Sequence, residues 1–436
     1  MPNRQSPWHI RLPATCLLAA GICHATAAGV GAQTVDQDLQ RCPTPAELAS
    51  VSSRLTLTFA NDPQGQVLVC TAAAGSANLS LLKKRAYNSL LAMQRLNFDT
   101  PLPWTAPPTA SLWDWFTLQA NIDGIAFSYS TGGGNSSCCS PANVINIVVA
   151  DNSYLSLTDR WDTYHSGPGG YGGGLGDTLA LFVHEARHNQ GYFHTCAGGN
   201  DQTFNEMGAW AIQSLLWYWI GNHGDPGYLR PVTNDVGADY YTDDARERAE
   251  HQRSTRICAD ARTFVSNDNI EFYNSGLKHY FMTANQAEAI GIDQGAAGPN
   301  WSRTGASFKI FPDPAHAPMN AMPVCRFYGT PGLGPNSHFF TIDPAECAQV
   351  KLDPGWTYEG IVFYMIKPFF DHTCSAYNER PGPPFTSSPT TRVLRLYNQR
   401  AAFGDSNHRY TTNSNTASVM ATQGWRAEGV VLCSPQ

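Results

Sequence analysis

The chain has 436 residues, 14% of them charged, and a formal net charge of −7. This length predicts two domains behind a processed leader, and the absence of a basic surface argues against nucleic acid as a partner. After the leader no segment offers about 18 consecutive apolar residues, so we expect no membrane span.

The first 32 residues have the layout of a secretory signal peptide. Arg4 and Arg11 supply the positive start, and residues 12–22 form an apolar stretch that is too short to span a membrane. Two small-residue motifs are candidate cleavage sites: Ala25-Thr26-Ala27 and Val30-Gly31-Ala32. We therefore expect a secreted, extracellular protein, with the periplasm as the other compartment that fits.

Residues 33–264 predict an α+β domain with a mixed sheet. Residues 54–60 alternate as a strand and could pair with residues 66–70 across a turn. A helix capped by Ser80 should run to about Leu96. Further strands are expected at residues 124–129 and 143–150.

The second part of this region predicts helices. A glycine-rich loop at 167–176 is either a connector or a cleft edge, and it lacks the Lys-Ser/Thr ending of a phosphate loop. Asp177 is expected to cap a helix that reaches His188. Two more helices are expected at about 203–219 and 243–256.

Two histidines on the first of these helices point to a metal. His184 and His188 are four residues apart, so they lie one turn apart on one helical face and their imidazoles can converge on one ion. Glu185, beside the first histidine, is placed to reach a metal-bound water rather than the metal. This arrangement predicts a catalytic centre with Glu185 as its base.

A third histidine follows the end of that helix. Gly191 stands where a left-handed C-cap belongs, and it allows the sharp turn that brings His194 back to the other two. Three neutral nitrogen ligands leave a fourth position open for water, which distinguishes a catalytic Zn²⁺ site from a closed structural one.

The spacing His-Glu-x-x-His-x-x-Gly-x-x-His resembles the extended motif of the metzincin clan of zinc peptidases. The chain looks closest to secreted bacterial metallopeptidase-like proteins with a His-Glu-Ala-Arg-His core. The resemblance implies a zincin-like catalytic domain over 33–264, Zn²⁺ bound by His184, His188 and His194, and Glu185 as general base.

Three residues that follow the motif bear on the assignment to the metzincin clan: Met207, Glu206 and Asp201. Metzincins have a methionine turn beneath the site, whereas Met207, the one methionine nearby, is expected inside a helix. Thermolysin-like gluzincins take their third ligand from an Asn-Glu pair on the next helix, so Glu206 is a rival to His194 or an acceptor for a ligand histidine. Asp201 is a further candidate for that supporting role.

The resemblance implies hydrolysis of peptide bonds in a protein or peptide substrate. Zn²⁺ would activate a water, and Glu185 would take its proton and pass it to the leaving amine. Tyr171 and Tyr192 are candidate oxyanion donors or structural aromatics. Two other functions use the same residues: a zinc amidase acting on cell-wall amides, and a non-catalytic binding protein with a vestigial zinc site.

The cysteines predict disulfide bonds. Of the 12 cysteines, Cys16 and Cys23 lie in the leader, and the even number that remains suits an exported protein. No Cys-x-x-Cys pair indicates a zinc-thiolate site. The sequence does not determine the connectivity; Cys42 with Cys70 and Cys374 with Cys433 are candidate pairs, and adjacent Cys138 and Cys139 are expected to bond to different partners.

Residues 265–436 contain three similar segments. Each has an aromatic strand, a histidine-containing segment and a tryptophan, in this order: Phe272-Tyr273-Asn274, His279-Tyr280-Phe281-Met282-Thr283 and Trp301; Arg326-Phe327-Tyr328, His338-Phe339-Phe340-Thr341 and Trp356; Arg395-Leu396-Tyr397-Asn398, His408-Arg409-Tyr410-Thr411-Thr412 and Trp425. The similarity predicts a β-rich domain of three pseudo-symmetric repeats, in which each copy buries its aromatics against the others.

This pattern resembles a bacterial secreted repeat family of unknown function that is often appended to exported hydrolases. The resemblance implies an accessory role in targeting or substrate binding. Packing of a core is the favoured interpretation of the repeated Tyr, His and Trp residues. The alternative is a pocket for a carbohydrate or cell-surface ligand, because aromatic side chains stack on sugar rings.

Overall fold

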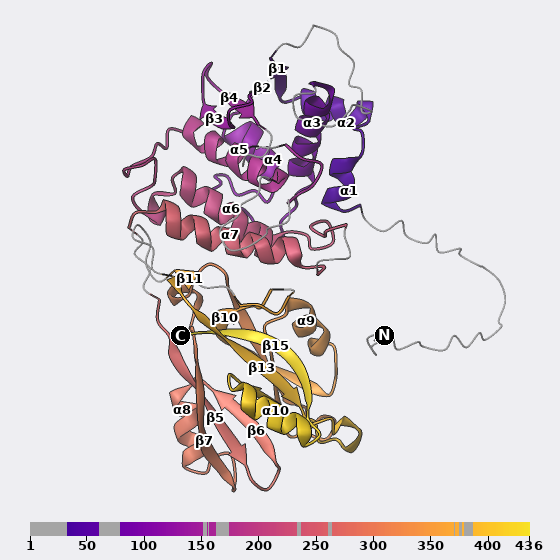
Figure 1. Ribbon diagram of the computed structural model, residues 1–436, viewed down its shortest axis with the longest axis vertical. Coiled ribbons are helices and arrows are strands. Elements are labelled where there is room, and N and C mark those ends of the chain that lie inside the picture. Colours follow the sequence, from indigo (N-terminus) through magenta and orange to yellow (C-terminus); the bar gives the residue numbers. More distant parts are fainter. Residues whose placement is uncertain are drawn as a thin grey trace, which may run out of the picture. The chain divides into compact units, whose positions relative to one another are not determined.

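The computed structural model describes residues 33–60, 79–150, 155, 157–162, 174–232, 237–259, 264–369, 371–374, 377–378 and 387–436 (Figure 1). Residues 33–436 form one compact unit by their contacts. The predicted leader, the glycine-rich loop up to residue 173, and Cys70 lie outside the described residues. No helix in the described ranges is long and apolar enough to cross a membrane.

A four-stranded sheet with the order β1-β2-β4-β3 lies in the first half of the chain. Its strands are β1 (Thr56–Phe59), β2 (Gly124–Tyr129), β3 (Asn135–Cys138) and β4 (Val144–Val149). The strands predicted at 124–129 and 143–150 are therefore confirmed as β2 and β4. β1 pairs in parallel with β2, while the partner predicted for it at 66–70 lies outside the described residues. β3 runs antiparallel to β4 and forms one edge of the sheet.

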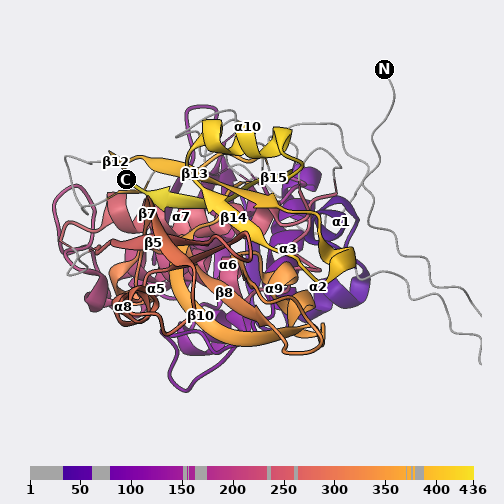
Figure 2. The same cartoon turned by 90° about the horizontal axis from the view of Figure 1, so that it is seen from below.

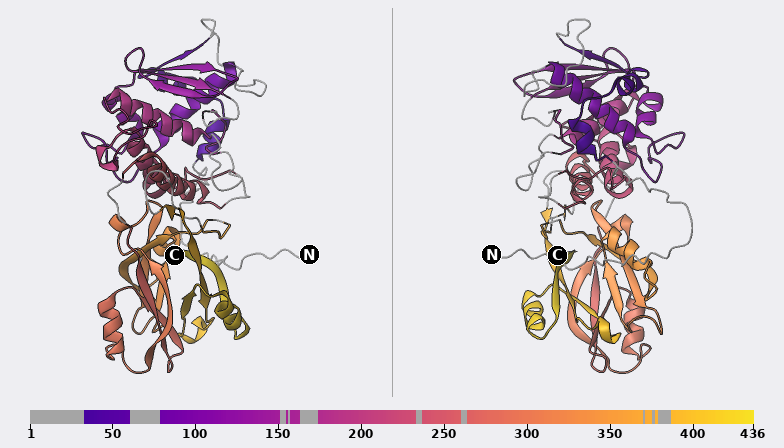
Figure 3. Two further views of the ribbon diagram at one scale, coloured as in Figure 1. Left: turned by 60° about the vertical axis from the view of Figure 1, so that its left-hand side comes forward. Right: turned by 90° about the vertical axis from the view of Figure 1, so that its right-hand side faces the viewer.

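Helices cover this sheet. They are α1 (Val35–Gln40), α2 (Pro45–Ser52), α3 (Leu79–Arg95), α4 (Leu112–Asp114) with a π-helical turn at Trp115–Gln119, α5 (Leu175–Asn189), a 3-10 turn at Phe204–Glu206, α6 (Ala209–His223) and α7 (Tyr240–Arg256). Figure 3 shows the strands on one side of the helices, with α5 next to the sheet. The fold of this half is thus α+β, as predicted.

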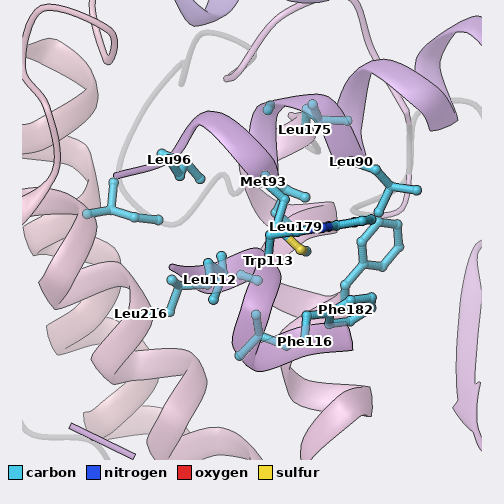
Figure 4. Packing of buried hydrophobic residues seen from close by; sticks show 14 of the residues in the cluster. Leu90, Met93, Leu96, Leu112, Trp113, Phe116, Leu175, Leu179, Phe182 and Leu216 are labelled. Atoms are coloured by element: carbon cyan, nitrogen blue, oxygen red, sulfur yellow. The ribbon is translucent and has the colours of Figure 1, made fainter. Parts of the chain in front are cut away.

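Helix α5 is anchored by apolar packing on its inner face. Leu175, Leu179 and Phe182 are fully buried against α3, where Leu90 and Met93 project toward them (Figure 4). Burial of each such side chain stabilises the fold by about 1.5–3 kcal/mol. This packing fixes where the polar residues at the end of α5 lie.

Three helix boundaries differ from the sequence prediction. α5 begins at Leu175 behind an extended Gly174, so Asp177 lies in the first turn and is not the cap. Ser80 already lies within α3. The helix expected from residue 203 starts only at Ala209, because Met207 adopts a left-handed conformation with φ of 52° and interrupts it.

The disulfides confirm one predicted pair and correct another prediction. Cys374 bonds to Cys433 as predicted. Cys138 and Cys139, expected to have different partners, bond to each other, with Cα atoms 3.0 Å apart across a cis peptide bond. The other described pairs are Cys196–Cys258 and Cys325–Cys347, and Cys42 is also disulfide-bonded.

In the second half of the chain, the described residues form strands and three short α-helices. The strands are β5 (Asn267–Asn274), β6 (His279–Thr283), β7 (Trp301–Ile310), β8 (Ala321–Gly329), β9 (His338–Thr341), β10 (Trp356–Ile366), β13 (Thr390–Tyr397), β14 (His408–Thr411) and β15 (Arg426–Pro435), with the short pair β11 (Tyr377–Asn378) and β12 (Ser387–Ser388). The helices are α8 (Gln286–Asp293), α9 (Pro344–Lys351) and α10 (Ser414–Thr422), with 3-10 turns at Pro314–His316 and Ala401–Phe403. The sheets have the orders β6-β5-β7 and β14-β13-β15-β10-β8-β9.

The order strand-strand-helix-strand occurs three times in this half. The three units are β5-β6-α8-β7, β8-β9-α9-β10 and β13-β14-α10-β15, and their helices lie at three separate places around the strands (Figure 2). Each helix is capped by an Asn or Asp whose backbone N–H donates to a threonine two residues earlier: Asn285 to Thr283, Asp343 to Thr341, and Asn413 to Thr411. The last strand of each unit carries a glycine at positive φ where its pairing is irregular: Gly305, Gly360 and Gly429.

The strand pairing also shows which residues correspond between units. His338 lies opposite Tyr328 and His408 opposite Tyr397, whereas in the first unit Tyr280 lies opposite Tyr273. The counterpart of the two histidines is therefore Tyr280 and not His279, because the three hairpins share one register and His279 lies one residue before the matching position.

His338 and His408 are packed among aromatic rings. His408 lies 4.9 Å from Phe339 and 4.9 Å from Tyr397, measured between ring centroids. Its burial, followed by the positive charges of Arg395 and Arg426, lowers its pKa to about 3. The imidazole is therefore neutral in the folded protein at ordinary pH.

Acid should destabilise the protein through His408. The unfolded side chain has a pKa of 6.5, so between that pH and about 3 the unfolded chain binds a proton that the folded chain does not. The contribution of His408 to the free energy of unfolding is fully present above pH 6.5. It decreases by about 1.4 kcal/mol per pH unit as the pH falls through this window.

His408→Phe should lower the slope of this pH dependence by about 1.4 kcal/mol per pH unit, measured by urea unfolding followed by circular dichroism, while His338 still contributes its own slope. The exposed His316 provides the control when slopes are compared above about pH 5, where its partner Asp313 stays ionised, since His316→Phe should leave the slope there as in the wild type. An unchanged slope in His408→Phe would show that another group causes the acid sensitivity.

Candidate metal centre

Helix α5 positions the first two histidines. His184 and His188 lie one turn apart, and His184 is only 4% exposed. The helix ends at Asn189, and Gly191 then adopts a φ of +87°, a conformation that favours glycine. The expected left-handed cap is confirmed, and the chain turns there toward His194.

The three predicted histidines come together. The ring centroids of His184 and His188 are 4.8 Å apart, those of His188 and His194 4.8 Å, and those of His184 and His194 5.2 Å. One nitrogen of each ring lies within 4.8 Å of the others. Such a group can hold a metal ion.

Hydrogen bonds orient two of the rings. Nδ1 of His188 contacts the carbonyl oxygen of Tyr192 at 2.6 Å, so it carries the proton and donates it there. Nδ1 of His194 lies 2.9 Å from Oδ1 of Asp201 and donates in the same way. Each contact fixes the tautomer and leaves Nε2 with a free lone pair, as a metal ligand requires.

The third ring is held by burial. Burial, followed by the neighbouring His188 and His194, lowers the pKa of His184 well below its usual value. Its Nδ1 has no hydrogen-bond partner among the described residues, and neither has Oε1 of Gln213 on α6. The Gln213 side chain lies close to the His184 ring and opposes part of the lowering of the His184 pKa. Its Oε1 and Nδ1 of His184 nevertheless do not form a hydrogen bond with each other.

Glu185 lies beside the histidines on the same helix and is 6% exposed. The hydroxyl of Ser136 donates to its Oε1 at 2.7 Å. Ser136 belongs to the edge strand β3, so the sheet and the helix jointly position this carboxylate. Neither Ser136 nor Gln213 was predicted, because no local pattern links them to the motif.

The two acidic alternatives have different surroundings. Glu206 lies outside the histidine group, and its Oε2 accepts a hydrogen bond from the hydroxyl of Thr195 at 2.6 Å. Asp201, 1% exposed, contacts His194 through Oδ1 and accepts from the backbone N–H of Trp210 at 2.9 Å through Oδ2. Asp201 therefore links the histidine to the start of α6.

Other nearby residues have structural contacts. The guanidinium of Arg187 lies 3.5 Å from the ring centroid of Tyr192, and its Nε donates to the carbonyl of Met207 at 2.8 Å. Met207, expected inside a helix, thus lies in a turn tied to α5. The other candidate oxyanion donor, Tyr171, lies outside the described residues.

Aromatic rings border the histidines. The Trp210 ring lies 4.3 Å from that of His184 and 6.0 Å from that of His194. Phe193, stacked 6.2 Å from His188, is 70% exposed. The group is thus buried on the Trp210 side and accessible near Phe193.

His194→Ala should lower metal affinity much more than Glu206→Ala, because only the histidine belongs to the converging group. The metal content after dialysis against a weak chelator, measured by mass spectrometry, checks this. Retention of metal by His194→Ala together with its loss from Glu206→Ala would assign the third ligand to Glu206.

Asp201→Asn should weaken metal binding by about 10–100-fold, because supporting carboxylates orient ligand histidines and strengthen their donation. Asp99→Asn is a matched control, since Asp99 contacts His223 at 2.8 Å away from this site. Competition with a coloured chelator gives both affinities. Equal metal affinity in the two variants would show that Asp201 does not support a ligand histidine.

Comparisons with known proteins reach only the second half of the chain. Residues 227–366 and 268–435 each match a domain of unknown function (DUF5648). No curated protein matches the chain, and no solved structure does. The matched segments contain the three strand-strand-helix-strand units and exclude the histidine group, so they assign no activity to it.

Proposed function

We propose that the protein is a secreted zinc metallopeptidase in which His184, His188 and His194 hold Zn²⁺ and Glu185 is the general base. The observation that carries the proposal is the convergence of three imidazoles next to a buried carboxylate on the same helix. In this proposal, residues 33–264 form a zincin-like catalytic domain and residues 265–436 an accessory domain of three pseudo-symmetric repeats.

The donor set suits Zn²⁺. Imidazole nitrogens are typical zinc ligands, and three of them leave a position open for water or substrate. Every described cysteine is disulfide-bonded, so no described thiol competes as a ligand. The neutral state of His184 and the Nδ1 contacts of the other two rings provide the lone pairs that metal binding needs.

Glu185 has the chemistry of a general base. When bound, Zn²⁺ lowers the pKa of a coordinated water toward about 7 and polarises the substrate carbonyl. The Glu185 carboxylate takes the proton of the attacking water and returns it to the leaving nitrogen. Ser136 holds Oε1 in place, which leaves Oε2 to exchange the proton.

The edge strand β3 favours a peptide substrate. Among the described residues β3 pairs with a strand on one side only, and the one backbone N–H of Ser136 already donates to Oδ1 of Asn135 at 2.9 Å, so the other main-chain groups of this outer edge are the ones that a peptide could pair with. An extended peptide can add to such an edge by main-chain hydrogen bonds. Since Ser136 on β3 touches Glu185, a peptide bound there would run past the base.

The disulfides and the absence of a membrane-crossing helix among the described residues are compatible with secretion. Disulfides persist in oxidising compartments, which include the extracellular space and the periplasm. The predicted leader supports the same placement.

Glu185→Gln should keep about one zinc per chain and lower casein cleavage by at least about 100-fold, because the base contributes roughly 10²–10⁴-fold to such reactions. Zinc content and the release of acid-soluble peptides measure the two effects. Glu206→Gln is the control and should cleave casein like the wild type.

Normal cleavage by Glu185→Gln would contradict the mechanism. Zinc binding by the wild type without cleavage of casein, but with release of amines from purified cell wall, would favour an amidase. Zinc binding without hydrolysis of either substrate would favour a non-catalytic binding protein.

A further inference from the structure

A pocket of about 510 Å³ lies between the first and second of the three similar units, far along the chain from the histidine group. Its volume falls within the range of about 300–1,000 Å³ that is usual for small-molecule sites. The side chains that matter for recognition are contributed by both units: Asn274, Asn300 and Trp301 from the first, and Tyr328, Asn336, His338 and Glu359 from the second.

One part of the pocket is aromatic. The rings of Tyr328 and His338 lie 4.8 Å apart, and Trp301 lines the pocket from β7. Trp301 is partly buried, with its ring 6.3 Å from that of Phe281. Aromatic faces carry partial negative charge and attract the weakly positive C–H groups on the face of a sugar ring.

Uncharged polar groups form another part. Asn300 lies at the rim and is exposed, and its carboxamide makes no hydrogen bond to a described residue. Asn336 accepts a hydrogen bond from the Tyr328 hydroxyl at 2.7 Å, which leaves its amide N–H groups as donors. Amides that donate and accept match hydroxyl groups, which do the same.

The charges in the pocket are already paired. Glu359 forms an ion pair with Nε of Arg326 at 2.8 Å, and Arg326 also binds Glu288 of α8. His338 lies 3.4 Å from the same carboxylate, and burial followed by Arg326 lowers its pKa to about 3, so it is neutral. The Glu359 carboxylate is thus fixed as an acceptor and needs no cationic ligand.

We propose that this pocket binds a pyranose ring of a neutral glycan, with Trp301 and Tyr328 against the ring and Asn300, Asn336 and Glu359 hydrogen-bonded to its hydroxyls. The site would attach the chain to a polysaccharide, whatever the histidine group does. A ligand rich in hydroxyls and without charge uses every part of the pocket.

Calorimetric titration of the full mature chain with chitohexaose, cellohexaose and maltohexaose tests the proposal. At least one of them should bind, and Trp301→Ala should weaken its binding by at least about tenfold. The matched control is Trp356→Ala, because Trp356 starts β10 as Trp301 starts β7 but does not line the pocket. The control should bind like the wild type.

A second variant separates recognition from folding. Asn300→Gly removes the carboxamide and suits the positive φ of 72° at this position. It should weaken binding by about fivefold with an unchanged melting temperature.

Three results would overturn the proposal. They are no binding of any of the three oligosaccharides, undiminished binding by folded Trp301→Ala, and binding of choline chloride in place of sugars. The last result would identify an aromatic cage for a cation. If Trp301→Ala fails to fold, undiminished binding by Asn300→Gly would overturn the proposal instead.

Discussion

The end of helix α5 is the constraint on which the candidate metal centre depends. The helix must run far enough to carry His184 and His188 on one face and then stop, since the third histidine is six residues beyond the second. Gly191 permits that stop because its φ of +87° is unfavourable for other residues. Apolar packing of α5 on α3 holds the end of the helix at its position in the fold. The turn at Gly191 then determines where His194 lies.

A layer of neighbours holds the converging groups in place. Tyr192 and Asp201 orient two imidazoles, burial keeps His184 neutral, and Ser136 holds Glu185. Asp201 also accepts hydrogen bonds from the first backbone amides of α6, so the orientation of His194 and the start of that helix depend on one carboxylate. Preorganisation of this kind is what hydrolytic chemistry at a metal requires, because ligands that are already oriented need not be ordered when the ion binds.

The sequence predicted the local features best. The histidines and Gly191 could be placed because helical spacing fixes their geometry within one short segment, and β2 and β4 were predicted at the positions where they are observed. Ser136 and Gln213 could not be predicted, since only the tertiary fold brings them to the motif. The bond between Cys138 and Cys139 contradicted the expectation of separate partners. The correspondence of Tyr280 with His338 and His408 is visible only from the strand pairing.

The central claim is that three histidines hold one metal ion with a position left open for water. A crystal structure of the zinc-loaded protein, with anomalous data at the zinc edge, tests it most directly. We expect a single strong peak bound by Nε2 of His184, His188 and His194, with a non-protein oxygen completing the coordination. A peak bound by the Glu206 carboxylate, or a fourth protein ligand that closes the site, would contradict it.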